Sequence, residues 1–498
     1  MKFASLVLDR AFSVAPIRRE LFGGFLEQAG RGIYGGVYEP SHPLADASGF
    51  RTDVLELLRE LGITSVRYPG GNFVSGYRWE DTVGPKSERP RTIDLAWRSI
   101  DTNEFGLDEF IAWTRVLGVE PRLAMNLGTR GVAEALDLLE YCNFPAGSKQ
   151  SELRRSHGAA EPYAVRTWYL GNEMDGPWQV GHKTAAEYAR LAVETARAMR
   201  QLDANLDLVA CGSSSFDMPW FGEWERVVLE EAYDVVDSIS AHQYYFEADG
   251  DRTSFLASGD HLDRYLKALI ATADHVQATG RHKRRMSISL DEWNVWYQGR
   301  PLAAGEEQDW VPGAPRLEDH YTVADGVVVG SMLITILQNS DRVHAANLAQ
   351  LVNVIGPIMT ENHGAAWKQT TFHPFALTAK ATGVVLGVAL TSPKHETLVH
   401  GEVATVDATA TWDDQTRSGK IFVVNRSVDE SVRLTVDARD IAMSQASAVY
   451  IGGQNLGGIA ASTTADEFQP RRNADLILEA GSLQVVLPPA SWTAIDFA

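Results

Sequence analysis

The sequence Val-Arg-Thr-Trp-Tyr-Leu-Gly-Asn-Glu at residues 165–173 is a short β-rich run that closes on an amide and a carboxylate. An amphipathic stretch, Thr184–Leu202, follows it, and the next β-rich run begins at Leu206. Short β-rich runs that alternate with longer amphipathic ones are typical of a parallel sheet wrapped by helices. The alternation extends from about Leu21 to Ala379, so the sequence predicts an α/β fold for this part of the chain.

About eight β-rich runs occur in this region, which fits a closed (β/α)₈ (TIM) barrel better than an open sheet. The candidate strands are Leu21–Ala29, Thr64–Tyr68, Pro121–Asn126, Val165–Glu173, Leu206–Cys211, Val236–His242, Arg285–Glu292 and Val343–Gln350. Helical patterns such as Thr52–Leu61 and Leu107–Leu117 separate them. We therefore predict a catalytic barrel over residues 20–380.

The pattern changes after about Gly383, where apolar and polar residues alternate one by one. Val432, Leu434 and Val436 are separated by Arg433 and Thr435. This period of two predicts an antiparallel β-sandwich domain over residues 381–498. Residues 1–19 are also strand-like and are expected to add a strand to that sandwich.

Composition excludes several classes of function. The chain has 498 residues with 45 Lys and Arg against 65 Asp and Glu, a net charge of −20, which disfavours nucleic acid and anionic membranes as partners. The longest apolar run, near Val327–Leu337, is shorter than the roughly 20 residues of a membrane span and predicts a buried helix. The first ten residues lack the pattern of a secretory signal, so we expect a cytoplasmic protein. Cys142 and Cys211 are expected to be reduced, structural thiols.

Polar residues cluster at the ends of the candidate strands, where TIM-barrel active sites are built. These strand-end residues are Glu27, Asn72, Asn126, Asn172, Glu173, His242, Tyr244, Asp291, Glu292 and Gln350. One such carboxylate could simply mark where a buried strand meets solvent. The arrangement at Glu173 is repeated at Glu292, however, and two independent strand-end glutamates are harder to explain in that way.

Two carboxyl groups facing one cavity are what cleavage of a glycosidic bond requires, because one must stay protonated while the other is ionised. Trp97, Trp178, Trp296 and Tyr244 offer apolar faces for sugar rings, although each aromatic alone is more often core. This chemistry needs no cofactor. The scattered histidines have no metal-ligand spacing, so no metal site is predicted.

Motifs that span the whole barrel resemble the α-L-arabinofuranosidases of glycoside hydrolase family 51. They are Phe-Gly-Gly-Phe-Leu-Glu at 22–27, Arg-Tyr-Pro-Gly-Gly-Asn-Phe-Val-Ser-Gly-Tyr at 67–77, Asp-Leu-Ala-Trp at 94–97, Thr-Asn-Glu-Phe-Gly at 102–106, Leu-Gly-Asn-Glu-Met-Asp-Gly-Pro-Trp-Gln at 170–179, His-Gln-Tyr-Tyr at 242–245, Asp-Glu-Trp-Asn-Val-Trp-Tyr at 291–297 and Asn-Leu-Ala-Gln at 347–350. The C-terminal region is less distinctive.

The resemblance implies that Glu173 is the general acid/base and Glu292 the nucleophile of a retaining enzyme. It implies an exo-acting enzyme that releases terminal arabinofuranose from arabino-oligosaccharides, and commonly a hexamer. The residues that it assigns to the furanose subsite are Glu27, Asn72, Trp97, Asn172, His242, Tyr244, Trp296 and Gln350, to which we add Trp178 as a further sugar-facing ring.

Further expectations concern geometry. Retention requires the two carboxyl groups to be about 5–5.5 Å apart, against about 6.5–9.5 Å for inversion.

Arg67 is expected to bond the Glu292 carboxylate and favour its charged form. Asp291 is expected to be structural and to face the helices, because neighbouring residues of a strand point to opposite faces. The acidic loop at about residues 305–319 could cap the pocket or contact another subunit.

Other functions remain open at this stage. The same site could act on a β-D-galactofuranoside, whose ring stereochemistry is closely similar. An endo-acting glucanase would need an open cleft on the same scaffold. A carbohydrate-binding protein that has lost turnover is a third alternative, and the presence of both glutamates argues against it.

Overall fold

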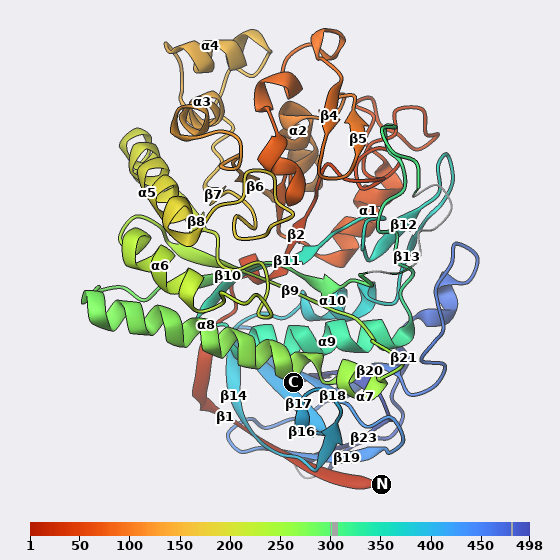
Figure 1. Ribbon diagram of the computed structural model, residues 1–498. Coiled ribbons are helices and arrows are strands. Elements are labelled where there is room, and N and C mark those ends of the chain that lie inside the picture. Colours follow the sequence, from red (N-terminus) through yellow and green to blue (C-terminus); the bar gives the residue numbers. More distant parts are fainter. Residues whose placement is uncertain (299, 301–306, 480–481) are drawn as a thin grey trace.

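The barrel is formed by eight parallel strands in the computed structural model, which describes residues 1–498 except 299, 301–306 and 480–481 (Figure 1). Their order around the closed barrel is β10-β11-β2-β3-β6-β7-β8-β9. The bounds are β2 Gly23–Phe25, β3 Ser65–Tyr68, β6 Glu120–Ala124, β7 Thr167–Leu170, β8 Asp207–Ala210, β9 Ser238–Tyr245, β10 Ser287–Val295 and β11 Val343–Ala349. The predicted (β/α)₈ fold is confirmed.

The first strand is much shorter than predicted. Arg19–Phe22 form a 3₁₀ turn (η1), and only Gly23–Phe25 pair with the neighbouring strands. Gly23 leaves no room for a side chain, because a Cβ there would lie 2.2 Å from Asn347 Oδ1. Two glycines therefore let the chain pass close to β11, and the residues up to Ala29 continue as a loop.

Helices surround the barrel (Figure 1). Their bounds are α1 Thr52–Leu61, α2 Leu107–Leu117, α3 Val132–Asn143, α4 Lys149–Ser156, α5 Ala185–Leu202, α6 Glu223–Ala232, α7 Arg252–Leu256, α8 Ser258–Gly280, α9 Val323–Gln338 and α10 Phe372–Thr378. The α5 helix starts where predicted, because the Thr184 hydroxyl accepts a hydrogen bond from the backbone of Glu187 and caps the first turn. Among the described residues, no helix is long and apolar enough to cross a membrane.

The predicted buried helix is α9, which is buried on every side from Val323 to Leu337. It packs against β10 of the barrel and against the strands of the second sheet. A helix between two apolar surfaces needs no polar face, which explains why most of its residues are apolar. It forms the main contact between the barrel and the β domain (Figure 1).

The C-terminal domain is a curled sheet with the order β21-β20-β24-β18-β17-β14-β1-β19-β23-β22. Its strands are β1 Lys2–Pro16, β14 Val384–Thr391, β17 Val406–Asp413, β18 Ser418–Asn425, β19 Val432–Ala438, β20 Ala446–Gly452, β21 Arg471–Arg472, β22 Leu476–Glu479, β23 Ser482–Leu487 and β24 Ser491–Phe497. The N-terminal strand joins this sheet as expected, antiparallel to β14 and parallel to β19. Strands from both ends of this sheet contribute to one hydrophobic core, which includes Leu6 of β1, Val423 of β18 and Val485 of β23. The domain boundary near residue 380 stays a prediction.

Three short hairpins complete the fold. They are β4 Thr92–Asp94 with β5 Ser99–Asp101, β12 Ile358–Thr360 with β13 Ala366–Lys368, and β15 Lys394–Thr397 with β16 Gly401–Ala404. The first hairpin carries Trp97 in its turn. Both cysteines are buried and unpaired, in agreement with the expected reduced state.

Candidate active site

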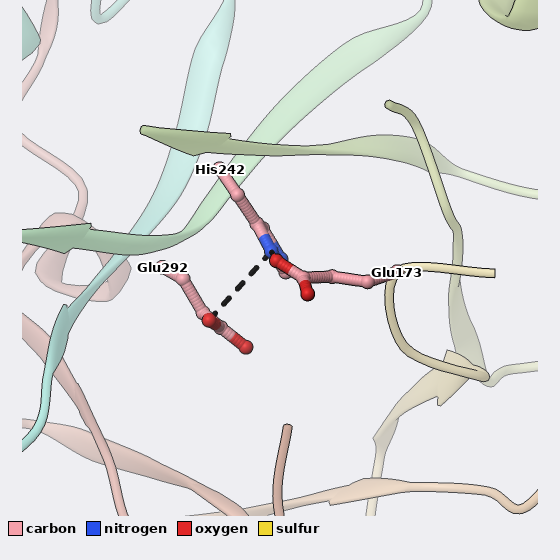
Figure 2. Close-up of side chains that lie close together, drawn as sticks. All are labelled: Glu173, His242 and Glu292. Atoms are coloured by element: carbon pink, nitrogen blue, oxygen red, sulfur yellow. Dashed lines mark hydrogen bonds and ion pairs between the residues drawn. The ribbon is translucent and has the colours of Figure 1, made fainter. Parts of the chain in front are cut away.

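The two glutamates that the sequence singles out come together at the carboxyl ends of the barrel strands. Glu173 follows β7 after Gly171 and Asn172, and its backbone has a positive φ of 43°. Glu292 lies within β10. One oxygen of each carboxyl group and one ring nitrogen of His242 all lie within 4.8 Å of one another (Figure 2). Two residues separated by more than a hundred positions therefore face one small volume.

Every oxygen of the two carboxyl groups accepts a hydrogen bond. Arg67 Nη1 donates to Glu292 Oε1 at 2.8 Å, and the Tyr244 hydroxyl donates to Oε2 at 2.7 Å. His242 Nδ1 lies 2.9 Å from Glu173 Oε1, and Trp178 Nε1 donates to Oε2 at 2.7 Å. Glu292 is thus held by a permanent cation, whereas Glu173 is held by an imidazole and an indole.

Arg67 connects the two catalytic strands. Its side chain is 1% exposed and lies between the rings of Phe25 and Tyr169, at 4.8 and 4.9 Å. Besides the expected bond to Glu292, its Nη2 donates to Asn172 Oδ1 at 2.5 Å. The planar guanidinium fixes both partners at once, which a lysine could not do.

Asp291 does not face the helices, so that prediction is wrong. Its carboxylate lies 3.4 Å from Arg67 Nε and 3.5 Å from His242 Nε2, and it is buried in the barrel. The cause is an irregularity in β10, whose pairing with β9 shifts between Ser289 and Glu292. A shift of this kind breaks the strict alternation of side chains, and both acidic residues then turn inward.

The environment moves the pKa values in directions that suit acid/base chemistry. Burial raises the pKa of Glu173, and the nearby charge of Glu292 raises it further. Burial opposes a charged His242, but the carboxylates of Glu292 and Asp291 outweigh it and raise the pKa of His242 well above its ordinary value. Burial also opposes a charged Asp291, yet its pKa is lowered by His242 and Arg67. A raised pKa suits Glu173 to a general-acid role, although the hydrogen bond and charge of His242 oppose the shift.

A second group of predicted site residues surrounds Glu27. Trp97 Nε1 and the backbone N–H of Phe73 both donate to Glu27 Oε1 at 2.9 Å. Gln350 Nε2 donates to Oε2 at 3.2 Å, and its own oxygen accepts the Glu27 N–H. Burial raises the pKa of Glu27 to about 8, although the hydrogen bonds from Phe73 and Trp97 oppose the shift. The family resemblance implies that Glu27, Trp97 and Gln350 share a subsite, and the structure brings the three side chains into hydrogen-bond contact.

Gly70 and Gly71 were not recognised as functional from the sequence. A Cβ on Gly70 would lie 2.8 Å from Glu27 Cγ, and a Cβ on Gly71 would lie 2.6 Å from Glu27 Oε2. The two glycines therefore leave the space that Glu27 occupies. Their signal was visible as the Pro-Gly-Gly stretch directly after β3, which is typical of a close backbone approach.

The remaining predicted residues lie at the edge of this network. Trp296 packs edge-to-face on Tyr244, with ring centres 5.1 Å apart. Trp178 is 51% exposed and lies beside Glu173. Asn72 begins the short helix η2 (Asn72–Gly76) after β3, and among the described residues its side chain makes no hydrogen bond. In the described part of the chain, none of these three side chains donates a hydrogen bond to the Glu27 carboxylate.

The cluster of Glu173, His242 and Glu292 also has the spacing of a potential metal site, which the sequence did not reveal. A cation there would have to displace hydrogen-bond donors from the carboxyl oxygens and would be repelled by Arg67. The residues present therefore fit a hydrogen-bonded acid/base site better than a metal centre.

Comparisons with known proteins agree with this geometry. Family models match residues 57–265 (α-L-arabinofuranosidase 1 domain) and 291–491 (α-L-arabinofuranosidase C-terminal domain). The chain is 51% identical to an intracellular exo-α-(1→5)-L-arabinofuranosidase of Streptomyces lividans, over 100% of this chain and 76% of that enzyme. It is 50% identical to an exo-α-(1→6)-L-arabinofuranosidase of Bifidobacterium longum, over 98% and 96%.

Among solved structures, a family 51 α-L-arabinofuranosidase from Bifidobacterium longum superposes with a TM-score of 0.95 at 42% identity, covering 100% of both chains. Identity at this level over the full length, together with the shared fold, shows the relationship directly. The chain belongs to the family 51 α-L-arabinofuranosidases.

Proposed function

We propose that this protein is a retaining, exo-acting α-L-arabinofuranosidase that releases terminal non-reducing arabinofuranosyl residues from arabino-oligosaccharides. The observation that carries the proposal is the approach of Glu173 and Glu292 oxygens to within 4.8 Å of each other and of His242. This separation supports the short spacing of retaining enzymes over the longer spacing of inverting ones. The names of the relatives support the sugar.

In the first step the Glu292 carboxylate attacks the anomeric carbon while the bond to the leaving oxygen breaks. Glu173 gives its proton to that oxygen, so the aglycone leaves as a neutral alcohol. The Arg67 and Tyr244 donors hold the Glu292 carboxylate in place for the attack. The product of this step is an ester between Glu292 and the sugar.

In the second step water attacks the anomeric carbon and the ester bond to Glu292 breaks. Glu173, now a carboxylate, takes the proton of that water and returns to its starting state. His242 stays 2.9 Å from Glu173 Oε1 and can stabilise this transient charge. We expect Asn172, whose side-chain oxygen accepts a hydrogen bond from Arg67, to bond the furanose 2-hydroxyl, an interaction that strengthens in the transition state.

The subsite for the terminal sugar is proposed to include Glu27, Trp97 and Gln350, which contact one another. His242, Tyr244, Trp296, Asn72 and Trp178 complete the proposed binding set. Relatives of nearly equal identity are named for (1→5) and for (1→6) bonds.

The test compares Glu173→Ala and Glu292→Ala on two arabinofuranosides, one with an activated aryl leaving group and one arabinobiose. Loss of Glu173 should slow the biose by about 10²–10⁴-fold and spare the first step on the aryl substrate, because only the poor leaving group needs a proton. Loss of Glu292 should abolish turnover of both. Unchanged turnover in Glu292→Ala, or faster wild-type turnover of an aryl galactofuranoside, would overturn the proposal.

We propose a cytoplasmic location, supported by relatives that are named intracellular. An enzyme in that compartment would act on short imported oligosaccharides rather than on intact polymer. A hexameric assembly is the further expectation from the family. Light scattering coupled to gel filtration measures the subunit number, and a monomer would contradict this expectation.

A further inference from the structure

Trp97 lies in the turn of the β4–β5 hairpin, outside the barrel strands. The hairpin pairs Asp94 with Ser99, and residues 95–98 form the turn between them. The Trp97 indole N–H reaches Glu27 Oε1 at 2.9 Å. A side chain on a surface hairpin therefore helps to orient a buried carboxylate, and the position of that hairpin must be set by other contacts.

The Asp94 carboxylate fixes the turn from inside. Asp94 is 6% exposed and accepts hydrogen bonds from the backbone N–H of Ala96 at 2.9 Å and of Trp97 at 3.2 Å. The hydroxyl of Ser99 also donates to it, at 3.2 Å. The buried Asp94 carboxylate thus binds both the backbone N–H of Trp97 and the side chain of Ser99, the first residue of the strand after the turn.

Arg316 fixes the same residue from the other side. Its Nε donates to the Trp97 carbonyl at 3.2 Å, and its Nη2 donates to the carbonyl of Gln308 at 2.7 Å. Its side chain is 11% exposed. Arg316 belongs to the segment between β10 and α9, so this guanidinium connects the segment after the nucleophile strand to the hairpin that carries Trp97.

Further contacts join the same two segments. Arg98 pairs with Asp309 at 2.7 Å, and the Trp310 N–H donates to the Arg98 carbonyl at 2.6 Å. Residues 307–316 therefore lie against the turn of the β4–β5 hairpin. Residues 305 and 306 of the predicted acidic loop lie outside the described residues.

We propose that Asp94 and Arg316 are positioning residues that act through Trp97, by fixing its backbone on both sides so that its indole N–H holds Glu27 for the sugar. The inference rests on the proposed function, because it takes the Glu27 group as the furanose subsite. An ordinary turn would need only the Asp94 contacts. The second contact, from a distant segment to the Trp97 carbonyl, is what indicates that the position of this residue matters.

A double-mutant cycle tests the inference, with kcat and KM measured on an aryl arabinofuranoside. Asp94→Ala should lower kcat/KM by roughly tenfold in the wild-type background, since it frees the tryptophan that orients Glu27. In a Trp97→Phe background, which lacks the indole N–H, the same substitution should change kcat/KM by less than about twofold. Ile93→Ala, at a 69% exposed position on the same hairpin, is the matched control and should resemble wild type.

Arg316→Ala is expected to follow the same non-additive pattern, and Arg316→Lys should recover part of the loss. If Asp94→Ala does not fold, Asp94→Asn replaces it in the cycle, because it keeps one acceptor oxygen. Asp94→Asn should show the same non-additive loss of kcat/KM with Trp97→Phe, but a smaller loss. Additive losses in the Trp97→Phe background would overturn the inference, as would an Asp94→Ala enzyme with wild-type kcat/KM. Glu292→Ala in the same assay separates the two proposals, because turnover that survives it would instead overturn the proposed function.

Discussion

Replacement of Arg67 by lysine is the sharpest structural test of how the nucleophile is held. The guanidinium donates to Glu292 and to Asn172 through different nitrogens and lies 3.4 Å from Asp291. A lysine keeps the positive charge but has one nitrogen on a side chain of different shape, so it cannot keep both hydrogen bonds. At least one of the two hydrogen bonds, to Glu292 or to Asn172, is lost.

The expected cost follows from the energy of such a contact. A hydrogen bond with a charged partner contributes about 1.5–3 kcal/mol, so losing one in the transition state corresponds to about a 10- to 150-fold fall in kcat/KM. The measurement is kcat/KM on an aryl arabinofuranoside, together with the melting temperature. The fall in kcat/KM should be larger than the fall expected from the fraction of enzyme that is unfolded at the assay temperature.

Arg122→Lys is the matched control. Arg122 lies directly beside Arg67 in the β3–β6 register, its side chain is 3% exposed, and its nearest ion-pair partner is Glu120 at 3.6 Å. This substitution should reduce stability but leave kcat/KM within about twofold, because no hydrogen bond to a catalytic glutamate is lost. The reasoning would be refuted by a folded Arg67→Lys enzyme with wild-type kcat/KM, or by equal losses in the two variants.

Three further predictions concern other parts of the site. Gly71→Ala places a methyl group 2.6 Å from Glu27 Oε2 and should raise KM. Gly76→Ala is the control and should leave KM unchanged, because a methyl group there meets open space. Equal KM values for the two variants would contradict this account. Trp178→Phe removes a hydrogen-bond donor that lowers the pKa of Glu173, so the pKa of Glu173 should rise. The alkaline limb of the kcat/KM profile, where the acid loses its proton, should then move to higher pH. A limb that stays in place or moves to lower pH would argue against Glu173 as the acid. Dialysis against a chelator should leave activity unchanged, and a loss restored by a divalent cation would reveal a metal site.

The barrel and its catalytic pair were predictable because their signals are local. Most of the candidate strands end in a polar side chain, and the carboxyl ends of barrel strands meet at one face, so Glu173 and Glu292 could be placed together without coordinates. The helix α9 was predictable for a similar reason, since a mainly apolar run that is too short to span a membrane is expected to be buried.

The failures have physical causes that act between distant segments. Asp291 was placed on the wrong face because the register shift in β10 depends on pairing with β9, which the sequence of β10 alone does not show. The first strand was predicted too long, since its apolar residues at Leu21 and Phe22 are buried in a 3₁₀ turn instead. The contact of Arg316 with Trp97 joins residues separated by 219 positions and has no local signature.

The most direct test of the central claim is to identify the residue that carries the sugar during turnover. The Glu173→Ala enzyme is mixed with an aryl arabinofuranoside, whose leaving group needs no proton, and quenched with acid. The second step is slow without its general base, so the intermediate should accumulate. Peptide mass mapping should find one pentosyl unit esterified to Glu292. A sugar on any other residue, or release of the aryl group with no covalent intermediate, would contradict the proposed mechanism.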